Sequence, residues 1–255
     1  MELKFFFFFI IVAVISLSSA SKLKCEFIET IYFEYSCEVQ NNGIFGKLQV
    51  TIDQIEGNHN STMTNNDVKA VSMNHIKNLS FVPKNIYKFF TNLVGLKITD
   101  SNLTEIYQSD FQNFSKLECL ILDNNQIEVI EKELFKFNLN LEMIVLKNNK
   151  ISHIDHFVFS KLKKLKFLIL SENVCKLQNA KNRTEVENLI KKIFLKQKVC
   201  ISKEKLKKHE ATKRISHKSI NNEVTSSYHK NSGTEVDLSN ICFIIVLYFV
   251  MKFQN

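Results

Sequence analysis

Aliphatic residues recur with a period of 24 residues through the middle of the chain. A pattern spaced as Leu-x-x-Leu-x-Leu begins at Leu93 and returns at Leu117, Leu141 and Leu165, with Ile in some places. Three further apolar columns keep this period: Leu103, Ile127 and Ile151; Ile106, Ile130 and Ile154; and Phe111, Phe135 and Phe159. An earlier unit that contains Val71 and Met73 is offset by one inserted residue at its strand. A fixed period of this length predicts a repeat architecture.

The Leu-x-Leu part of each unit predicts a short strand. Alternate side chains of a strand point to opposite faces, so the leucines face the interior of a coil and the residues between them face outward. No single unit can bury its apolar face, so we expect the coils to stack their strands into a parallel sheet. Each buried Leu, Ile or Phe then contributes about 1.5–3 kcal/mol. The predicted fold class is an α/β solenoid.

Asparagine follows the second strand leucine by three residues in three units, at Asn125, Asn149 and Asn173. A side-chain amide at this point can satisfy backbone groups where the chain bends away from the strand. We therefore expect a ladder of asparagines between coils. Ser101 stands at the same place in the first full unit and is a shorter substitute.

These units resemble the extracellular leucine-rich repeat family, whose consensus is Leu-x-x-Leu-x-Leu-x-x-Asn-x-Leu. Leu117 to Ile127 and Leu141 to Ile151 match it closely, and the resemblance covers about 68–175. Phe81 to Leu93 and Leu23 to Phe27 are similar to segments of secreted insect members. The resemblance implies a horseshoe with a concave parallel sheet, disulfide-bonded terminal caps and a ligand that is usually a protein. It implies no catalysis and no cofactor.

Cysteines flank the repeats on both sides. An open solenoid exposes its core at each end, so terminal units must differ from the rest. We expect disulfides between Cys25 and Cys37 and between Cys175 and Cys200. At the N-terminal end, the alternating segments 35–39 and 48–52 predict a pair of strands that caps the solenoid.

A helix is expected between Cys175 and Cys200. Thr184 and Glu187 have the spacing of a capping box. The apolar residues that follow have helical spacing and predict one stripe that packs on the last coil: Val186, Leu189, Ile190, Ile193 and Phe194.

Both ends of the chain have the pattern of targeting segments. Phe5 to Ile15 is an apolar run that precedes Ser18-Ser19-Ala20, which predicts a secretory signal peptide cleaved after Ala20. Near the other end, Ile241 to Met251 is too short for a good membrane span. The small residues from Asn231 to Gly233 and the polar spacer after them resemble a glycosylphosphatidylinositol (GPI) signal with lipid attachment at Asn231. A short single-pass anchor and a merely apolar tail are the alternatives.

The predicted organisation follows from these segments. It comprises a signal peptide at 1–20, an N-terminal cap at 21–67, leucine-rich repeats at 68–174, a C-terminal cap at 175–201, a basic flexible stalk at 202–240 and a hydrophobic C-terminal tail at 241–255.

The outward strand positions form the predicted concave face. Several of them are apolar over the last three coils, and such a patch often marks a partner surface. The alternative is that aliphatic residues favour β conformation here and that the cap or the tail partly covers the patch. The candidate ligand-binding residues are Ile121, Asp123, Met143, Val145, Lys147, Phe167 and Ile169. Cys119 lies in the same patch as a thiol or as half of a disulfide across a homo- or heterodimer.

Sequons for N-glycosylation occur at Asn60, Asn78, Asn102, Asn113 and Asn182. None falls in a Leu-x-Leu strand, and secretion would allow some of them to carry glycans.

The net charge of +8 is concentrated in part after the repeats, at 203–218. A basic stalk could contact an anionic polysaccharide, or it is a solvated spacer; secretion argues against nucleic acid. With only five Gly, the chain has no Gly-rich phosphate loop. His153, Asp155 and His156 lie on a return segment that faces water, so we expect no metal site and no enzyme.

The predicted function is protein–protein recognition outside the cell or on its surface, without catalysis. A surface-tethered adhesion protein or co-receptor is the first hypothesis, and a soluble humoral innate-immune recognition protein is the alternative.

Overall fold

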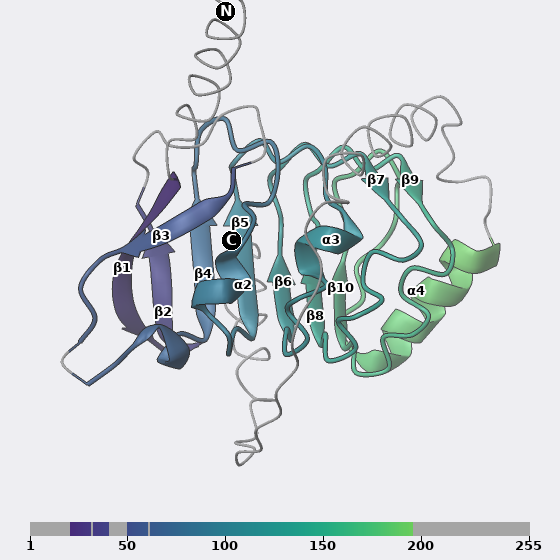
Figure 1. The fold of residues 1–255 in the computed structure, drawn as a ribbon. Helices are drawn as coiled ribbons and strands as arrows, with labels where there is room; N and C mark the ends of the chain where they lie inside the picture. Colours follow the sequence, from purple (N-terminus) through teal and green to yellow (C-terminus); the bar gives the residue numbers. More distant parts are fainter. Residues whose placement is uncertain (1–20, 32, 41–49, 61, 196–255) are drawn as a thin grey trace, which may run out of the picture.

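The computed structural model describes residues 21–31, 33–40, 50–60 and 62–195. Eight strands form one sheet in the order β10-β8-β6-β5-β4-β2-β1-β3. Their bounds are Ser21–Thr30 (β1), Glu34–Val39 (β2), Ile52–Glu56 (β3), Ala70–Asn74 (β4), Gly95–Thr99 (β5), Cys119–Ile121 (β6), Met143–Val145 (β8) and Phe167–Ile169 (β10). The strands lie side by side from the N-terminal end of the fold to the C-terminal end (Figure 1).

Short elements connect these strands on the other side of each coil. They are the 3-10 turn η1 (Asn65–Asp67), the helices α2 (Ile86–Phe89) and α3 (Gln108–Phe111), and the paired strands β7 (Val129–Ile130) and β9 (His153–Ile154). Helix α4 (Arg183–Leu195) follows the last coil and lies at the far end of the fold (Figure 1).

The pairing of the strands confirms the sequence period. Leu120 lies opposite Leu96 in β5 and opposite Ile144 in β8, so each step is one 24-residue unit. Val71 of β4 pairs with Leu96, one residue further along than the period requires. This offset is the insertion expected in the first unit.

The interior of the coils is packed with the predicted apolar columns. Phe111, Phe135 and Phe159 are each at most 2% exposed. The ring centroid of Phe135 lies 6.2 Å from that of Phe111 and 6.0 Å from that of Phe159. One aromatic ring from each coil therefore continues the core from one unit to the next.

The asparagine ladder is present as predicted. The Nδ2 of Asn125 donates to the carbonyl oxygen of Ile98, one coil earlier, at 2.7 Å. Its Oδ1 accepts the backbone N–H of Leu103 at 3.0 Å. Ser101 also satisfies backbone groups at this bend. Its hydroxyl accepts the N–H of Ile76 at 3.1 Å and donates to the carbonyl of Thr99 at 2.6 Å.

The N-terminal cap is a disulfide-bonded hairpin. β1 and β2 pair antiparallel, and the predicted disulfide between Cys25 and Cys37 joins them. β2 then pairs in parallel with β4, which connects the cap to the solenoid.

The predicted pairing of segments 35–39 and 48–52 is wrong. β2 lies between β1 and β4, whereas β3, which begins at Ile52, pairs with β1. Local alternation identified the strand at 35–39, but the long hairpin at 21–39 determines which strand lies beside it. Residues 41–49 lie outside the described part of the chain.

The N-cap residue of helix α4, in the C-terminal cap, lies two residues before the predicted one. The Oδ1 of Asn182 accepts the backbone N–H of Glu185 at 2.9 Å, and the Glu185 carboxylate accepts the N–H of Lys181 at 2.8 Å. Asn182 is therefore the N-cap, and the expectation for Thr184 and Glu187 is wrong. The asparagine side chain reaches the backbone N–H at N3 just as the predicted threonine would have done.

Most of the predicted stripe on α4 packs against the last coil. Val186, Leu189 and Ile193 are buried, and Ile190 is half-buried. Phe194 is 45% exposed and contacts the ring of Phe157 instead, with the centroids 5.7 Å apart.

Several predicted features lie outside the described residues. They are the signal peptide, the stalk, the C-terminal tail, Cys200 and the lipid site at Asn231. Cys175, the predicted partner of Cys200, is disulfide-bonded. Within the part of the chain that the structure describes, no helix has the length and apolar character needed to cross a bilayer.

Candidate binding surface on the concave sheet

Side chains at alternate positions of β6, β8 and β10 point away from the solenoid core and form a second, separate cluster. We call this the concave cluster; its members and their exposed fractions are Cys119 (0%), Ile121 (2%), Met143 (0%), Val145 (6%) and Phe167 (5%). The Sγ of Cys119 lies 3.8 Å from the Sδ of Met143. Among the described residues, Phe33 and Ile169 also pack against the cluster.

The sequence placed these side chains on the correct face of the sheet and left open whether the patch is exposed or covered. In the structure Ile121, Met143, Val145 and Phe167 are buried. Ile169 is half-buried. The strand pattern gives the direction of each side chain, whereas burial depends on what lies above the sheet. The alternative of a covered patch is the one that fits.

Phe33 bounds the concave cluster at its N-terminal end. It lies in the turn between β1 and β2, and its backbone N–H donates to the hydroxyl of Thr30 at 3.0 Å. Its ring lies directly over Gly95, where an added Cβ would come within 2.5 Å of a ring carbon. Gly95 is therefore required at this position so that the hairpin turn can reach over β5. No sequence pattern pairs Phe33 with Gly95, which lie 62 positions apart, so this contact could not be predicted.

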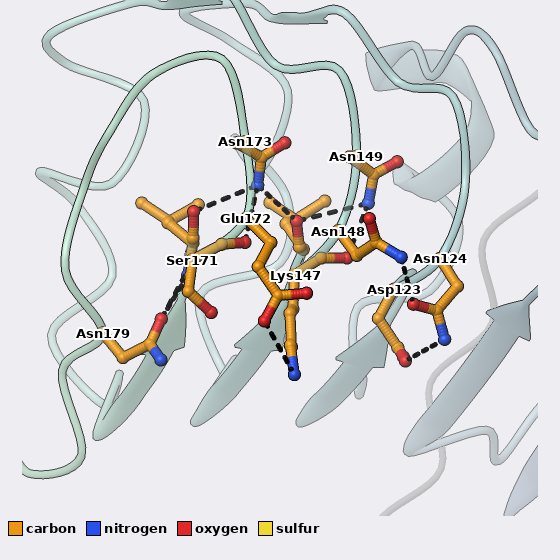
Figure 2. A network of polar contacts seen from close by, with 11 residues as sticks. Asp123, Asn124, Lys147, Asn148, Asn149, Ser171, Glu172, Asn173 and Asn179 are labelled. Carbon is orange, nitrogen blue, oxygen red and sulfur yellow. Dashed lines mark hydrogen bonds and ion pairs between the residues drawn. The ribbon is translucent and has the colours of Figure 1, made fainter. Parts of the chain in front are cut away.

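A row of polar residues follows the concave cluster along the strands and comprises Thr99, Asp123, Lys147 and Ser171, one from each coil. Figure 2 shows three of them, Asp123, Lys147 and Ser171, with their polar contacts. Lys147 forms an ion pair with Glu172 at 3.1 Å. The Nδ2 of Asn124 donates to the Oδ2 of Asp123 at 3.2 Å, and Asn148 donates to Asn124 at 2.8 Å.

Asp123 is the residue of this row with an unsatisfied group. The side chain is buried, and among the described residues its Oδ1 has no hydrogen-bond partner. Burial raises the pKa of the Asp123 carboxyl, and the nearby Asp100 raises it further. A backbone hydrogen bond and the charges of Lys97 and Lys147 oppose this pKa shift. A hydrogen-bond donor brought to this carboxylate would relieve the cost of its burial.

The N-terminal half of the concave face is polar. Asn74 donates to Glu38 at 3.2 Å and to the hydroxyl of Ser72 at 2.8 Å, and the hydroxyl of Thr99 donates to Asn74 at 2.7 Å. Burial raises the pKa of the Glu38 carboxyl, while its hydrogen bond with Ser72 and the charge of Lys97 oppose that shift. Glu38 was not predictable as part of this face, because the repeat period does not extend into the cap. The face thus divides into a polar half over β2, β4 and β5 and an apolar half over β6, β8 and β10.

The asparagines of all five sequons are exposed: Asn60, Asn78, Asn102, Asn113 and Asn182. Their glycosylation stays a prediction. For metal binding, the described residues contain no group of three or more His, Cys, Asp or Glu side chains that could hold an ion.

Comparison with known proteins agrees with this geometry. Residues 115–174 match the family model for the leucine-rich repeat. The fold is a leucine-rich repeat solenoid. The matched segment includes β6, β8 and β10, so the leucine-rich repeats carry the whole concave cluster.

Among solved structures, the repeat solenoid is similar to a chain in the structure of the Toll–Spätzle complex, titled a molecular hub in Drosophila development and innate immunity. The identity is 24% and the TM-score is 0.39 over 49% of this chain. The match covers 16% of the other chain, so this protein spans a small part of that relative's length. A similarity of this extent says nothing about ligand or role. No curated protein matches the sequence.

Proposed function

We propose that this leucine-rich repeat protein recognises a protein ligand through its concave face, as a surface-tethered adhesion protein or co-receptor. The observation that carries the proposal is the concave cluster. Its five apolar side chains point away from the core that packs the coils together and form a cluster of their own. An apolar patch on an outer face is typical of a partner surface once it is accessible.

The chemistry of the face indicates what kind of ligand it would suit. When accessible to a ligand, the buried side chains of Met143 and Phe167 would offer polarisable and aromatic surface to an apolar side chain. Asp123 lies beside them in the polar row and offers a carboxylate oxygen to an N–H donor. A protein segment that presents an apolar side chain next to a basic or amide group would satisfy both.

The tether is supported by the sequence alone, and the compartment by the sequence and one disulfide. The signal-peptide pattern at 1–20, the predicted GPI site at Asn231 and the tail at 241–255 lie outside the described residues. The disulfide between Cys25 and Cys37 suits an oxidising compartment. The basic stalk at 202–240 would hold the solenoid away from the membrane, and contact with an anionic polysaccharide would follow from its charge.

Localisation of the protein tests the tether. The chain would be expressed in insect cells with an epitope tag near Ser202, and surface and medium fractions would be compared before and after phosphatidylinositol-specific phospholipase C. Release by the lipase supports a lipid-anchored adhesion protein or co-receptor. Protein that accumulates in the medium without lipase supports the soluble humoral alternative and contradicts the tether. Surface protein that resists the lipase indicates a short membrane anchor.

Binding through the concave face has a separate test. The solenoid would be displayed on suspended insect cells, and aggregation with cells that display the same chain or a library of extracellular proteins would be scored. The variant Met143→Asp, Phe167→Asp should lose binding, while Phe137→Asp, an exposed aromatic away from this face, should keep it. Equal binding by wild type and the concave variant at equal surface level would contradict the proposed face.

A further inference from the structure

Three turns along one edge of the solenoid carry lysines and no acidic residue. They are the segments 112–116, 136–140 and 160–164, which precede β6, β8 and β10 in three successive coils, and we call them together the basic edge. The lysines of the basic edge are all exposed: Lys116, Lys136, Lys161, Lys163 and Lys164. Positive charge gathered in this way favours a partner that carries negative charge.

Most of the charge of the basic edge is not neutralised by neighbouring acids. Lys136 pairs with Glu133 at 2.8 Å, and among the described residues this is the ion pair that the edge forms. Lys116 and Lys164 each donate to an asparagine side chain one coil earlier, at 2.7 and 2.9 Å. Because an amide is neutral, these two lysines keep their full charge.

Two apolar side chains stand among these lysines. Phe137 and Leu139 are 47% and 50% exposed, and the Nζ of Lys136 lies 5.7 Å from the centroid of the Phe137 ring. The 24-residue period places Lys161 beside Phe137 in the next coil and Lys163 beside Leu139. Exposed apolar side chains surrounded by lysines are typical of a surface that meets a membrane.

Hydrogen bonds fix the three turns of the basic edge relative to one another. The buried side chain of Asn138 donates to two carbonyl oxygens of the preceding coil, both at 2.9 Å. Asn140 donates to the carbonyl oxygen of Ser115 at 3.0 Å, also one coil earlier. In the last turn, Arg183 of α4 donates to the carbonyl oxygen of Leu162 at 2.9 Å. The edge therefore presents its lysines and apolar side chains on a preformed scaffold, which lowers the entropic cost of binding.

We propose that the basic edge binds the surface of a bilayer that contains anionic lipid. Phe137 and Leu139 enter below the headgroups, and the lysines stay at headgroup level, where their ammonium groups meet lipid phosphate and carboxylate. A soluble polyanion such as a sulfated polysaccharide satisfies the lysines but leaves both apolar side chains in water. The combination on the edge therefore favours a bilayer.

Contact at the basic edge would set the orientation of the solenoid. β6, β8 and β10 begin at this edge, so with the edge on a bilayer these strands run away from the membrane and the concave face opens sideways. The basic edge shares no residue with the concave cluster. The proposal therefore does not rest on the recognition function proposed for that cluster.

The predicted sequon at Asn113 lies within the basic edge. Asn113 occupies the position of Phe137 one coil earlier, and it is exposed. A glycan at this position would hold a bilayer away from Phe137. The site is therefore open on chains that carry no glycan at Asn113, and protein made in bacteria is the material for its test.

A local probe separates contact at this edge from binding through the rest of the chain. Residues 21–255 would be produced in an oxidising bacterial cytoplasm with an environment-sensitive fluorescent amino acid at position 139 or, as control, at position 174. Val174 is also exposed, but it follows β10 and so lies at the opposite edge of the sheet. Vesicles of three parts phosphatidylcholine to one part phosphatidylserine, with brominated acyl chains, should quench the probe at 139 and not the probe at 174.

The two probe positions also define the results that would overturn the proposal. Equal quenching at 139 and 174 would do so, because the stalk or the tail would then hold the chain to the vesicle without this edge. Absence of quenching at 139 would overturn it as well. Both measurements use the wild-type lysines, so they do not depend on how a charge variant folds.

Charge variants test the lysines. Lys161→Glu, Lys163→Glu should weaken binding to the anionic vesicles by at least about tenfold, as followed by the probe at 139. Lys150→Glu, Lys176→Glu makes the same change in net charge at exposed positions of the opposite edge and should keep the affinity. Equal losses in the two variants would overturn the proposal, because net charge alone would then determine binding. Added salt should weaken the wild type.

A last comparison separates the bilayer from a soluble polyanion. Phe137→Asp keeps every lysine of the edge but should lose most of the quenching at 139, because its side chain no longer enters the bilayer. Wild type that binds heparin through Lys161 and Lys163 but shows no quenching on vesicles would overturn the bilayer in favour of a polysaccharide. No protein ligand is needed in these measurements, so failure of recognition by the concave face would leave their result unchanged.

Discussion

The side-chain amide of Asn149 joins two coils, because its Nδ2 donates to the carbonyl oxygen of Leu122 at 2.9 Å, one coil earlier. Its Oδ1 accepts the backbone N–H of Ile127 at 3.0 Å. The residue is 7% exposed, so water cannot readily replace these bonds. The asparagine thus satisfies buried backbone groups that the bend after each strand leaves without partners in their own coil.

We expect Asn149→Ala to lower the free energy of unfolding by about 1–3 kcal/mol, since it leaves buried backbone groups unsatisfied. Urea denaturation followed by circular dichroism would measure the loss. The neighbouring Lys150→Ala is the control: Lys150 is exposed, so the loss of its side chain should change stability by less than about 0.5 kcal/mol. Similar effects for both variants would contradict the ladder.

The buried phenylalanine column inside the solenoid should contribute strongly to stability. Phe135 is 2% exposed and contacts a ring in the coil on each side. Phe135→Ala should cost about 3–5 kcal/mol through lost burial and the cavity that remains. Phe137→Ala removes a ring of the same size that is 47% exposed and should cost less than about 1 kcal/mol. Thermal melts of the two variants, side by side, would test this difference.

The N-terminal disulfide should contribute measurably to stability. It links Cys25 and Cys37 over a separation of 12 residues, and Cys37 is fully buried in the cap. Replacing both residues by alanine should lower the free energy of unfolding by about 2–4 kcal/mol. Reduction of the wild type under native conditions should move its denaturation midpoint in the same direction, and an unchanged midpoint would contradict the prediction.

The carboxyl of Asp123 predicts a pH dependence. Burial raises its pKa above the ordinary 3.8, so the folded chain holds this proton more tightly than the unfolded chain does. Stability contributed by the protonated form is therefore present at low pH and is lost as pH rises from about 3.8 through the raised pKa. Asp123→Asn should make this decline shallower, as measured by urea denaturation at intervals between pH 4 and pH 7, and the raised pKa of Glu38 accounts for part of the decline that remains.

Asp67 supplies the control with the opposite sign. Hydrogen bonds from the side chain and backbone of Thr64 lower the pKa of the Asp67 carboxyl. The stability that these bonds contribute is present at neutral pH and is lost as pH falls through the lowered pKa. Asp67→Asn should therefore weaken the protein most at neutral pH. The same direction of change in both variants would contradict the assigned environments.

Asn182 combines a helix cap with a sequon, and two variants separate these roles. Asn182→Gln removes both the N-cap and the glycan acceptor, and the lost cap should cost about 1 kcal/mol. Thr184→Ala destroys the sequon but keeps the hydrogen bond from Glu185 to Asn182. On secreted protein treated with peptide N-glycosidase F, only the first variant should melt lower than wild type. Before treatment, each should lack the same glycan mass.

The interior of the solenoid was predictable from the sequence because it follows from a period. Leu96, Leu120 and Ile144 lie in register, and Asn125 and Asn149 lie where the 24-residue spacing placed them. Each unit meets the same neighbours, so a pattern read in one coil holds in the next. The strand period of two also gave the direction of every outward side chain.

The ends of the solenoid were less predictable because the period stops there. β2 pairs with β1, the strand that begins at Ser21, and β3 pairs with the other edge of β1. The alternation of apolar and polar residues at 48–52 does not show which of these strands will be neighbours. Asn182 rather than Thr184 is the cap: either side chain could accept a backbone N–H, and α4 begins at Arg183, directly after Asn182.

The sequence by itself determined the repeat, the inward columns, the asparagine ladder and the face on which the concave cluster lies, since each of these depends on short-range geometry that recurs every 24 residues. Only the tertiary structure decided that Cys119 and Met143 are buried, that Phe33 lies over Gly95 and that Asp123 has a carboxylate oxygen without a partner among the described residues. Burial and hydrogen-bond satisfaction depend on segments distant in the chain that meet above the sheet, and no periodic pattern encodes such a meeting.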